Sequence, residues 1–263
     1  MRLKRFLLSI GLLISVIVIP IPNANALTVK VAPAGWTYLF TGDTSASKTS
    51  TPRVLSVNLE KKSNFVPIYN NVPDVAKASI QRAIDIWSEN FSSKVPVNVN
   101  VAWTKAPNST ILASASAKNI FSNFNAAPDK TLYYPSALAN ALAGVDLDIG
   151  EPELEINVTT GDFWYYGLDG KCPSNKYDLV SVILHEMAHG LGFMSGTYYD
   201  PATRVGRFLQ PTAFDAYVQL PDGRRLVDLP SPSLEIGAAL TSTLLWSGAN
   251  ALKANNGVKP LLF

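Results

Sequence analysis

The feature that most constrains this chain is the stretch DLVSVILHEMAHGLGFMS, residues 178–195, which contains its only two histidines. His185 and His189 stand four positions apart, and no glycine or proline interrupts the run that leads to them, so the run is predicted to be helical. Four residues at about 100° each return both imidazoles to one face of a helix. A separate apolar stripe, expected to face the core, consists of Val180, Leu184, Met187 and Leu191.

Glu186 completes an H-E-x-x-H pattern with the two histidines. Two imidazoles in this arrangement can bind one Zn2+ ion at about 2.0–2.1 Å. Glu186 is rotated by about 100° from His185, which suits it to accept a proton from a metal-activated water rather than to ligate. The pattern predicts zinc-dependent hydrolysis, with His185 and His189 as metal ligands and Glu186 as general base. Two ordinary helix histidines are the simpler alternative.

A third zinc ligand is not evident. A catalytic zinc normally has three protein ligands, but in the extended pattern H-E-x-x-H-x-x-G-x-x-H the last position holds Ser195, a poor zinc ligand. Gly190 and Gly192 are expected to end the helix and redirect the chain. The carboxylates that could complete the site within the chain are Asp215 and Asp200, although a turn or capping role is simpler for each.

Periodicity places further elements around this helix. An amphipathic helix is predicted at residues 73–91, followed by half-buried strands at residues 95–103 and 154–158. Farther along, we expect a hairpin turning at Asp222-Gly223 and a helix within residues 231–248 that starts near Ser231 or Ser233. Together these elements predict an α+β fold in which a twisted mixed sheet carries an upstream helix and the zinc-binding helix.

Residues 1–26 have the basic start, apolar middle and small-x-small end of a secretory signal peptide, with cleavage expected after Ala26. An uncleaved N-terminal anchor is the alternative. The segment contains three basic residues and no acidic one, so its removal takes the formal net charge from +2 to −1. Without a basic excess, the mature chain is not expected to bind nucleic acid or a membrane. We expect a secreted protein, extracellular or periplasmic.

Cys172 is the only cysteine, so no disulfide can form within the chain. A free thiol, a partner in another molecule and a partner outside this sequence are the possibilities. Residues 27–70 read as strands and loops that either begin the main domain or form a propeptide.

The stretch YDLVSVILHEMAHGLGFMSG, with INVTTGDFWYYGLDG before it and FDAYV and LLWSGANA after it, resembles a family of secreted bacterial zinc metallopeptidases related to the metzincins. The resemblance covers most of residues 75–263. It implies a zincin-like fold, with residues 71–263 as the metallopeptidase domain. It also implies a Zn2+ cofactor and a protein or peptide substrate extended along an edge strand near Leu154–Val158.

In such peptidases the third histidine comes from a distant segment, as in the leishmanolysin-like enzymes. The resemblance therefore implies that the chain is truncated at its C-terminus. Truncation would also account for three features of the sequence. No methionine lies beyond Ser195 to form the methionine turn (Met-turn) of the metzincins, Cys172 has no second cysteine, and the sequence ends on apolar residues at Phe263.

The leading functional prediction is a secreted zinc endopeptidase. The alternative is a secreted binding or surface protein that keeps a degraded peptidase fold without activity. The sequence does not indicate a cleavage preference or an oligomeric state.

Overall fold

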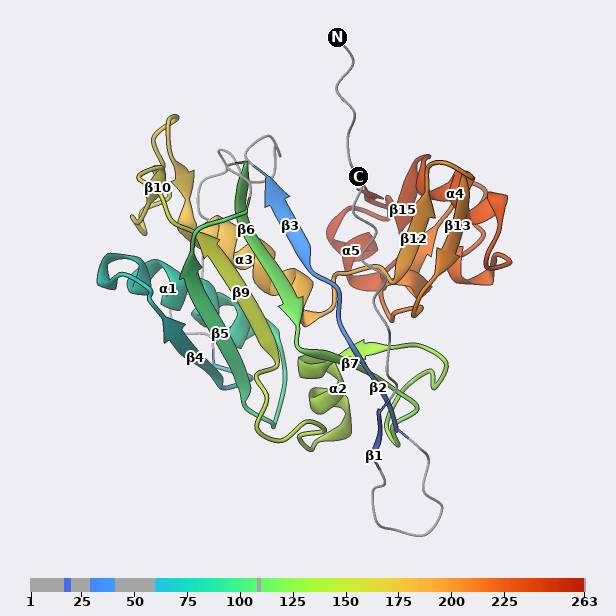
Figure 1. Cartoon of the computed structure of the whole chain (residues 1–263), viewed down its shortest axis with the longest axis horizontal. Helices are drawn as coiled ribbons and strands as arrows, with labels where there is room; N and C mark the ends of the chain where they lie inside the picture. Colours follow the sequence, from blue (N-terminus) through green and yellow to red (C-terminus); the bar gives the residue numbers. More distant parts are fainter. Residues whose placement is uncertain (1–16, 20–28, 41–59, 108–109, 263) are drawn as a thin grey trace.

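The computed structural model describes residues 17–19, 29–40, 60–107 and 110–262 (Figure 1). Most of the predicted signal peptide, including its cleavage site at Ala26, and much of the segment 27–70 lie outside the described residues. Within the described ranges, no helix combines the length and the apolar character that crossing a membrane requires.

The largest element is a mixed sheet in the order β3-β6-β9-β5-β4 (Figure 1). Its strands are β3 (Thr37–Phe40), β4 (Phe65–Asn70), β5 (Val97–Thr104), β6 (Ile111–Ala117) and β9 (Leu154–Thr159). β4, β5 and β9 run parallel, whereas β6 is antiparallel to both β9 and β3. The predicted strands at 95–103 and 154–158 are confirmed as β5 and β9. Because β9 lies between β6 and β5, its prediction as an edge strand is wrong.

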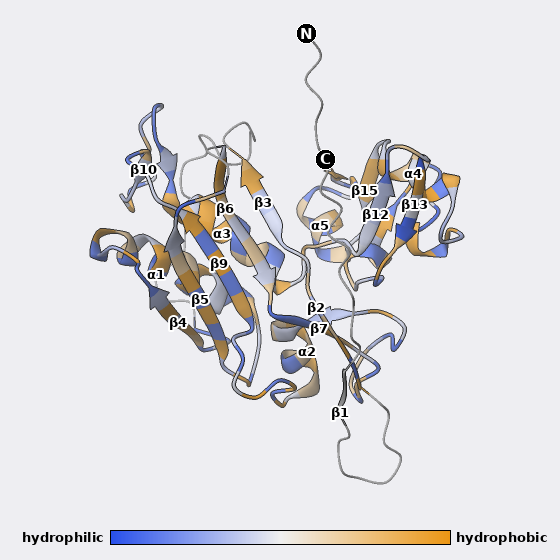
Figure 2. Ribbon diagram, viewed as in Figure 1, coloured by the Kyte–Doolittle hydropathy of each residue, from blue (hydrophilic) through white to orange (hydrophobic). Residues whose placement is uncertain are grey.

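One face of this sheet is apolar because buried and less buried residues alternate along β5 and β9. In β5 the valines Val97, Val99 and Val101 are buried and the asparagines between them are not. Hydrophobic and hydrophilic residues therefore alternate along β5 and β9 (Figure 2). The apolar face provides the core, and the polar face turns away from it.

Two helices cover the apolar face. α1 (Asp74–Asn90) confirms the helix predicted at 73–91 and connects β4 to the parallel strand β5. α3 (Leu179–Leu191) packs against α1, β6 and β9. Ile80 and Ile84 of α1 are fully buried, and the indole of Trp87 donates to the carbonyl oxygen of Leu184 at 3.2 Å. α3 is thus held between the sheet and α1.

The N-terminal described segment contributes to two sheets. β2 (Val29–Pro33) pairs with β7, and a few residues later β3 pairs with β6. β2 belongs to a sheet in the order β1-β2-β7-β8, which adjoins α2 (Figure 1). The bounds of these elements are β1 (Ile17–Ile19), β7 (Asn119–Ser122), β8 (Tyr134–Pro135) and α2 (Ser136–Ala143).

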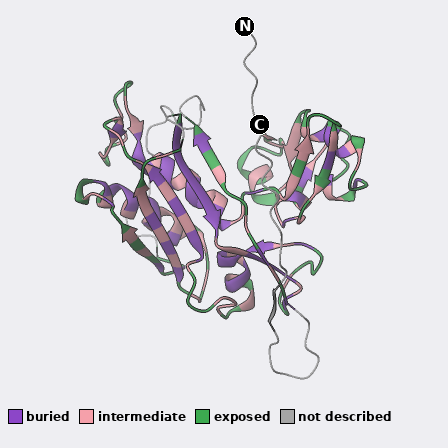
Figure 3. Cartoon of the chain, in the orientation of Figure 1, coloured by how far each residue is buried: buried purple, intermediate pink, exposed green. Residues whose placement is uncertain are grey.

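The rest of the chain forms small elements after β9, and its C-terminal part is more exposed than the main sheet (Figure 3). Two short sheets pair β10 with β11 and β12 with β13, and a third has the order β14-β15-β16. The strands are β10 (Trp164–Tyr165), β11 (Tyr177–Asp178), β12 (Thr197–Asp200), β13 (Val205–Phe208), β14 (Val218–Gln219), β15 (Leu244–Trp246) and β16 (Leu261–Leu262). The helices are η1 (Asp215–Tyr217), η2 (Leu226–Asp228), α4 (Leu234–Leu240) and α5 (Ala249–Ala254).

The C-terminal predictions are met in part. The turn at Asp222-Gly223 is present, with Gly223 at φ +91°, but a single bridge joins Gln219 to Arg225 before the chain enters η2. The predicted helix begins after Ser233, whose hydroxyl accepts a hydrogen bond from a first-turn amide at 3.0 Å. It ends at Leu240, and the apolar residues beyond it form β15.

Candidate active site

Helix α3 positions all three residues of the H-E-x-x-H pattern. Its buried side includes Val182, Ile183 and Met187, which are inaccessible to solvent. His185 and His189 are half-buried on the side of the helix that the core leaves accessible. Gly190 lies inside the helix rather than ending it, which corrects the prediction. A Cβ at Gly190 would lie 2.7 Å from the Leu154 side chain, so this glycine allows α3 to approach β9 closely.

The two histidines point their outer nitrogens at each other. The Nε2 atoms of His185 and His189 lie 2.9 Å apart, and the rings meet nearly at right angles. Two nitrogens that both lie about 2.0–2.1 Å from one zinc ion can be at most about 4 Å apart. The pair therefore fits a single metal ion without movement of the helix backbone.

A backbone carbonyl also orients the imidazole ring of His189. Its Nδ1 atom lies 2.7 Å from the carbonyl oxygen of Phe193, which can only accept, so Nδ1 carries the proton and Nε2 keeps its lone pair. Burial lowers the pKa of His189, which favours the neutral ring that binds metals. The sequence analysis missed the role of Phe193. Its position four residues after His189, across the glycine turn, is the signal that could have identified it.

Aromatic rings hold Phe193 in place. Its ring centroid lies 4.6 Å from that of Phe214 and 5.3 Å from that of Trp246. Phe214 and Trp246 stack on each other at 4.9 Å. The C-terminal part of the chain thereby fixes the backbone carbonyl that orients His189.

Glu186 is fully buried in the middle of α3. Neither carboxylate oxygen has a hydrogen-bond partner within the described part of the chain. Burial alone raises the pKa of Glu186 to about 8. A buried polar group without a partner costs about 1–3 kcal/mol, and more when it is charged. This carboxyl group is available for a ligand, a proton or water.

Ser195, at the third ligand position of the extended pattern, is hydrogen-bonded to Asp215. After α3 the chain turns at Gly192, with φ +128°, and brings Ser195 to Asp215. The Ser195 hydroxyl donates to Asp215 Oδ1 at 2.6 Å. It also lies 2.7 Å from the hydroxyl of Thr197. The serine links the end of the helix to the C-terminal part.

Asp215 is fully buried and well supplied with donors. Besides Ser195, the backbone amides of Gly196 (2.9 Å) and Thr212 (2.8 Å) donate to its Oδ2 atom. The Thr212 hydroxyl lies 3.0 Å from the same oxygen and 2.8 Å from the carbonyl of Met194. Burial raises the pKa of Asp215, and these hydrogen bonds act in the opposite direction. The contacts agree with the turn or capping role, at the start of η1 rather than of a strand.

Asp200 closes a turn of its own. Its carboxylate accepts hydrogen bonds from the Ala202 amide at 2.9 Å and the Thr203 hydroxyl at 2.8 Å. The Thr203 hydroxyl lowers the pKa of Asp200. Across the described residues, no group of three or more His, Cys, Asp or Glu side chains is arranged to hold a metal ion. Asp215 and Asp200 therefore do not join His185 and His189 in this structure.

Cys172 lies in the loop that precedes α3 and is free. Burial raises the pKa of its thiol. The thiol donates to the backbone carbonyls of Pro173 and Lys176, each at 3.5 Å. Its partner, if it has one, stays a prediction.

The comparisons with known proteins give one match. A family model described as SPBPB7E8-like matches residues 42–218, which is more than half of the chain and includes all of α3 and Asp215. No curated protein and no solved structure matches the chain.

Proposed function

The chain belongs to the SPBPB7E8-like family, and from the geometry of α3 we propose that it is a secreted zinc-dependent endopeptidase with Glu186 as its general base. The observation that carries the proposal is the buried Glu186 carboxyl group without a partner, adjacent in sequence to a pair of convergent histidines. A purely structural helix would gain stability by replacing such a carboxyl group with an apolar side chain.

The residues that would hold the zinc ion are His185 and His189, through their Nε2 atoms. Support comes from the 2.9 Å separation of these atoms and from the Phe193 carbonyl, which leaves Nε2 of His189 unprotonated. The ion would lower the pKa of a water molecule and polarise the carbonyl group of the scissile bond. The third ligand stays a prediction, with Asp215 and Asp200 as candidates within the chain.

Glu186 would move the protons of the reaction. Burial raises the pKa of Glu186 to about 8, which is near the operating range of a general base. A cation held by the neighbouring histidines would bring this pKa down toward neutrality. The carboxylate would take a proton from the attacking water and deliver it to the nitrogen of the leaving amine. Its two oxygens have no competing donors, so neither is withheld from this role.

The substrate would be a protein or peptide bound as an added strand. β9 is interior, so the edges that the described sheet offers are β3 and β4. We favour β3, because a cavity of about 240 Å³ is lined both by Trp36 and Thr37 at its start and by Met194–Thr197, which follow α3. A peptide paired with β3 would lie beside the end of α3 that carries His189.

The test measures bound zinc and hydrolysis of a fluorogenic casein with the exported protein. Glu186→Gln should lower kcat/KM by about 10²–10⁴ while zinc is retained, and His185→Ala should lose both. Glu89→Gln, a change on the α1 surface, is the matched control and should behave as the wild type.

Zinc bound with no hydrolysis, in the wild type and in Glu186→Gln alike, would overturn the enzyme proposal. That outcome would support the alternative, a secreted binding or surface protein with a degraded peptidase fold. Zinc that survives both Asp215→Ala and Asp200→Ala would remove the two carboxylates as third ligands.

A further inference from the structure

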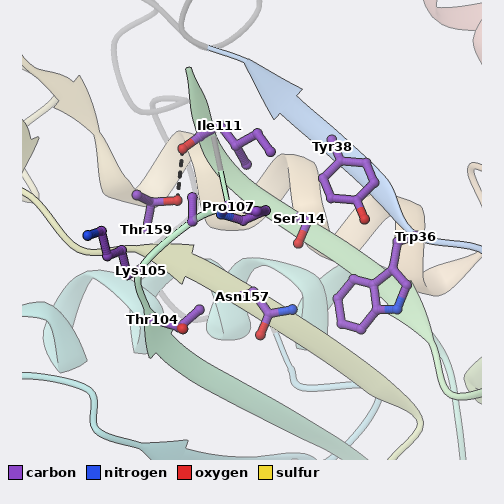
Figure 4. Close-up of a pocket in the computed structure, with 10 residues that line it drawn as sticks. Trp36, Tyr38, Thr104, Lys105, Pro107, Ile111, Ser114, Asn157 and Thr159 are labelled. Carbon is purple, nitrogen blue, oxygen red and sulfur yellow. Dashed lines mark hydrogen bonds between the residues drawn. The ribbon is translucent and has the colours of Figure 1, made fainter. Parts of the chain in front are cut away.

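The polar face of the main sheet, on the side away from α1 and α3, contains a pocket of about 350 Å³ (Figure 4). Its walls come from β3, β6 and β9 and from the end of β5. This volume lies within the range of small-molecule sites, about 300–1,000 Å³. The pocket opens on the opposite side of the sheet from α3, and it shares only Trp36 with the described lining of the 240 Å³ cavity proposed for the peptide substrate.

The strand register builds the pocket. Tyr38 of β3 is paired with Ser114 of β6, and Ser114 is paired with Asn157 of β9, so the three side chains form one row across the sheet. Trp36 precedes Tyr38 by two residues and therefore projects on the same side. The small Ser114 between a large ring and an amide leaves the hollow that Figure 4 shows.

Two of the polar groups in the pocket are not used by the protein, whereas the Thr159 hydroxyl donates to the carbonyl of Ile111 at 2.8 Å. Ser114 is only 5% exposed, yet its hydroxyl has no hydrogen-bond partner among the described residues, and neither has the amide of Asn157. Their neighbours on the same face differ. The Ser116 hydroxyl donates to a backbone carbonyl, with Ala117 O at 2.7 Å, and Asn100 is hydrogen-bonded to Asn70. The Ser114 hydroxyl and the Asn157 amide can therefore hydrogen-bond a ligand in the pocket.

The rings at the rim are also unusual for a polar sheet face. Trp36 is 40% exposed and Tyr38 is 49% exposed, so both present aromatic surface to solvent beside the hydroxyl and amide groups. Among the described residues of the lining, Lys105 is the only charged one and none is acidic. The pocket therefore combines flat apolar surface with neutral donors and acceptors.

These features select among ligand classes. A purely apolar ligand would leave the Ser114 hydroxyl and the Asn157 amide unbonded, which is costly for buried polar groups. A strongly anionic ligand would find one cationic side chain, Lys105, among the described residues of the lining, which is little charge to offset its own. A peptide strand would need free backbone groups, but Ser114 and Asn157 lie in strands paired on both sides. A sugar ring has the required combination, because its C–H face can stack on an aromatic ring while its hydroxyl groups both donate and accept.

We propose that this pocket binds a neutral carbohydrate, with Trp36 and Tyr38 stacking on sugar rings and Ser114 and Asn157 hydrogen-bonding sugar hydroxyls. The site would attach the protein to a glycan independently of any hydrolysis at α3.

The experiment is isothermal titration calorimetry of the full chain with four neutral hexasaccharides, built from β-1,4-glucose, β-1,4-xylose, β-1,4-mannose and β-1,4-N-acetylglucosamine units. At least one should bind, and Trp36→Ala and Tyr38→Ala should each weaken that binding at least about tenfold. Asn157→Ala leaves both rings in place and should weaken it as well. Tyr198→Ala, at a tyrosine of similar exposure on β12, is the matched control and should bind as the wild type.

Absence of binding by all four hexasaccharides at millimolar concentration would overturn the proposal. Equal affinity of the wild type, Trp36→Ala and Tyr38→Ala would do the same. Tighter binding of a heparin hexasaccharide, lost in Lys105→Ala, would overturn the assignment to neutral sugars. Glu186→Gln should bind the sugar unchanged, so failure of this proposal is distinguishable from failure of the peptidase proposal.

Discussion

Glu186 of α3 and Asp215 of η1 are both fully buried carboxylates, yet their surroundings are opposite. Asp215 accepts hydrogen bonds from the Ser195 hydroxyl and from the amides of Gly196 and Thr212, whereas Glu186 has no partner in the described part of the chain. Burial by itself therefore does not distinguish a structural carboxylate from a reactive one. The distinction lies in the donors: those around Asp215 hold the chain after α3, whereas the described residues offer none to Glu186.

The largest effect expected from this contrast is the loss of protein stability when Asp215 is replaced. Asp215→Ala removes the acceptor for three donors at once and should lower the free energy of unfolding by about 4–5 kcal/mol. Urea denaturation followed by circular dichroism measures the change. A loss below about 1 kcal/mol would show that the network around Asp215 does not hold the segment after α3.

The next effect is the pH dependence of the metal-free protein. The pKa of Glu186 is about 8 in the folded state and near 4.5 when unfolded, so between these values the folded state retains a proton that the unfolded state has released. The free energy of unfolding should therefore fall by about 4–5 kcal/mol as the pH rises from about 4.5 to above 8. Glu186→Gln should remove this fall. If the free energy of unfolding of the wild type and of Glu186→Gln changed with pH in the same way, the raised pKa of Glu186 would be contradicted.

A smaller effect, opposite in sign to that at Asp215, is expected from an apolar replacement. Glu186→Met should raise the stability of the metal-free protein by about 1–3 kcal/mol at pH 7, because it removes buried oxygens that have no partner. Thermal unfolding in the presence of a chelator measures it. Destabilisation by this change would mean that Glu186 has a structural role after all.

The smallest effect concerns the third position of the extended zinc pattern. Ser195→Ala removes one of three donors to Asp215 and should cost about 1 kcal/mol. Zinc affinity should stay unchanged, because the hydroxyl of Ser195 is directed to Asp215. A marked loss of zinc at preserved stability would identify Ser195 as a ligand, and equilibrium dialysis distinguishes the two results.

Elements with a strong periodic pattern were predictable from sequence. The four-residue spacing of Ile80 and Ile84 identified α1, and the alternation of valines and asparagines identified β5, since each pattern reports one buried face. The H-E-x-x-H spacing alone placed His185 and His189 on one side of α3. These features depend only on residues close together in the chain.

Features that depend on distant segments were not predictable. The interior position of β9 follows from its pairing with β5 and β6, which no local pattern encodes. Gly190 was interpreted as a helix end, but its small size serves the contact with Leu154 on another element. The apolar residues of β15 were taken as a continuation of α4 because a short apolar run suits either structure.

The position of β3 has a consequence for aggregation. β3 reaches the main sheet from the N-terminal segment and covers an edge of β6. If processing removed residues 29–40, the backbone donors and acceptors of β6 would be exposed along residues 111–115, which have no charged side chain. An uncharged open edge is a template for strand addition by another molecule. β3 thus covers this part of β6, and trimming it should promote self-association of the protein.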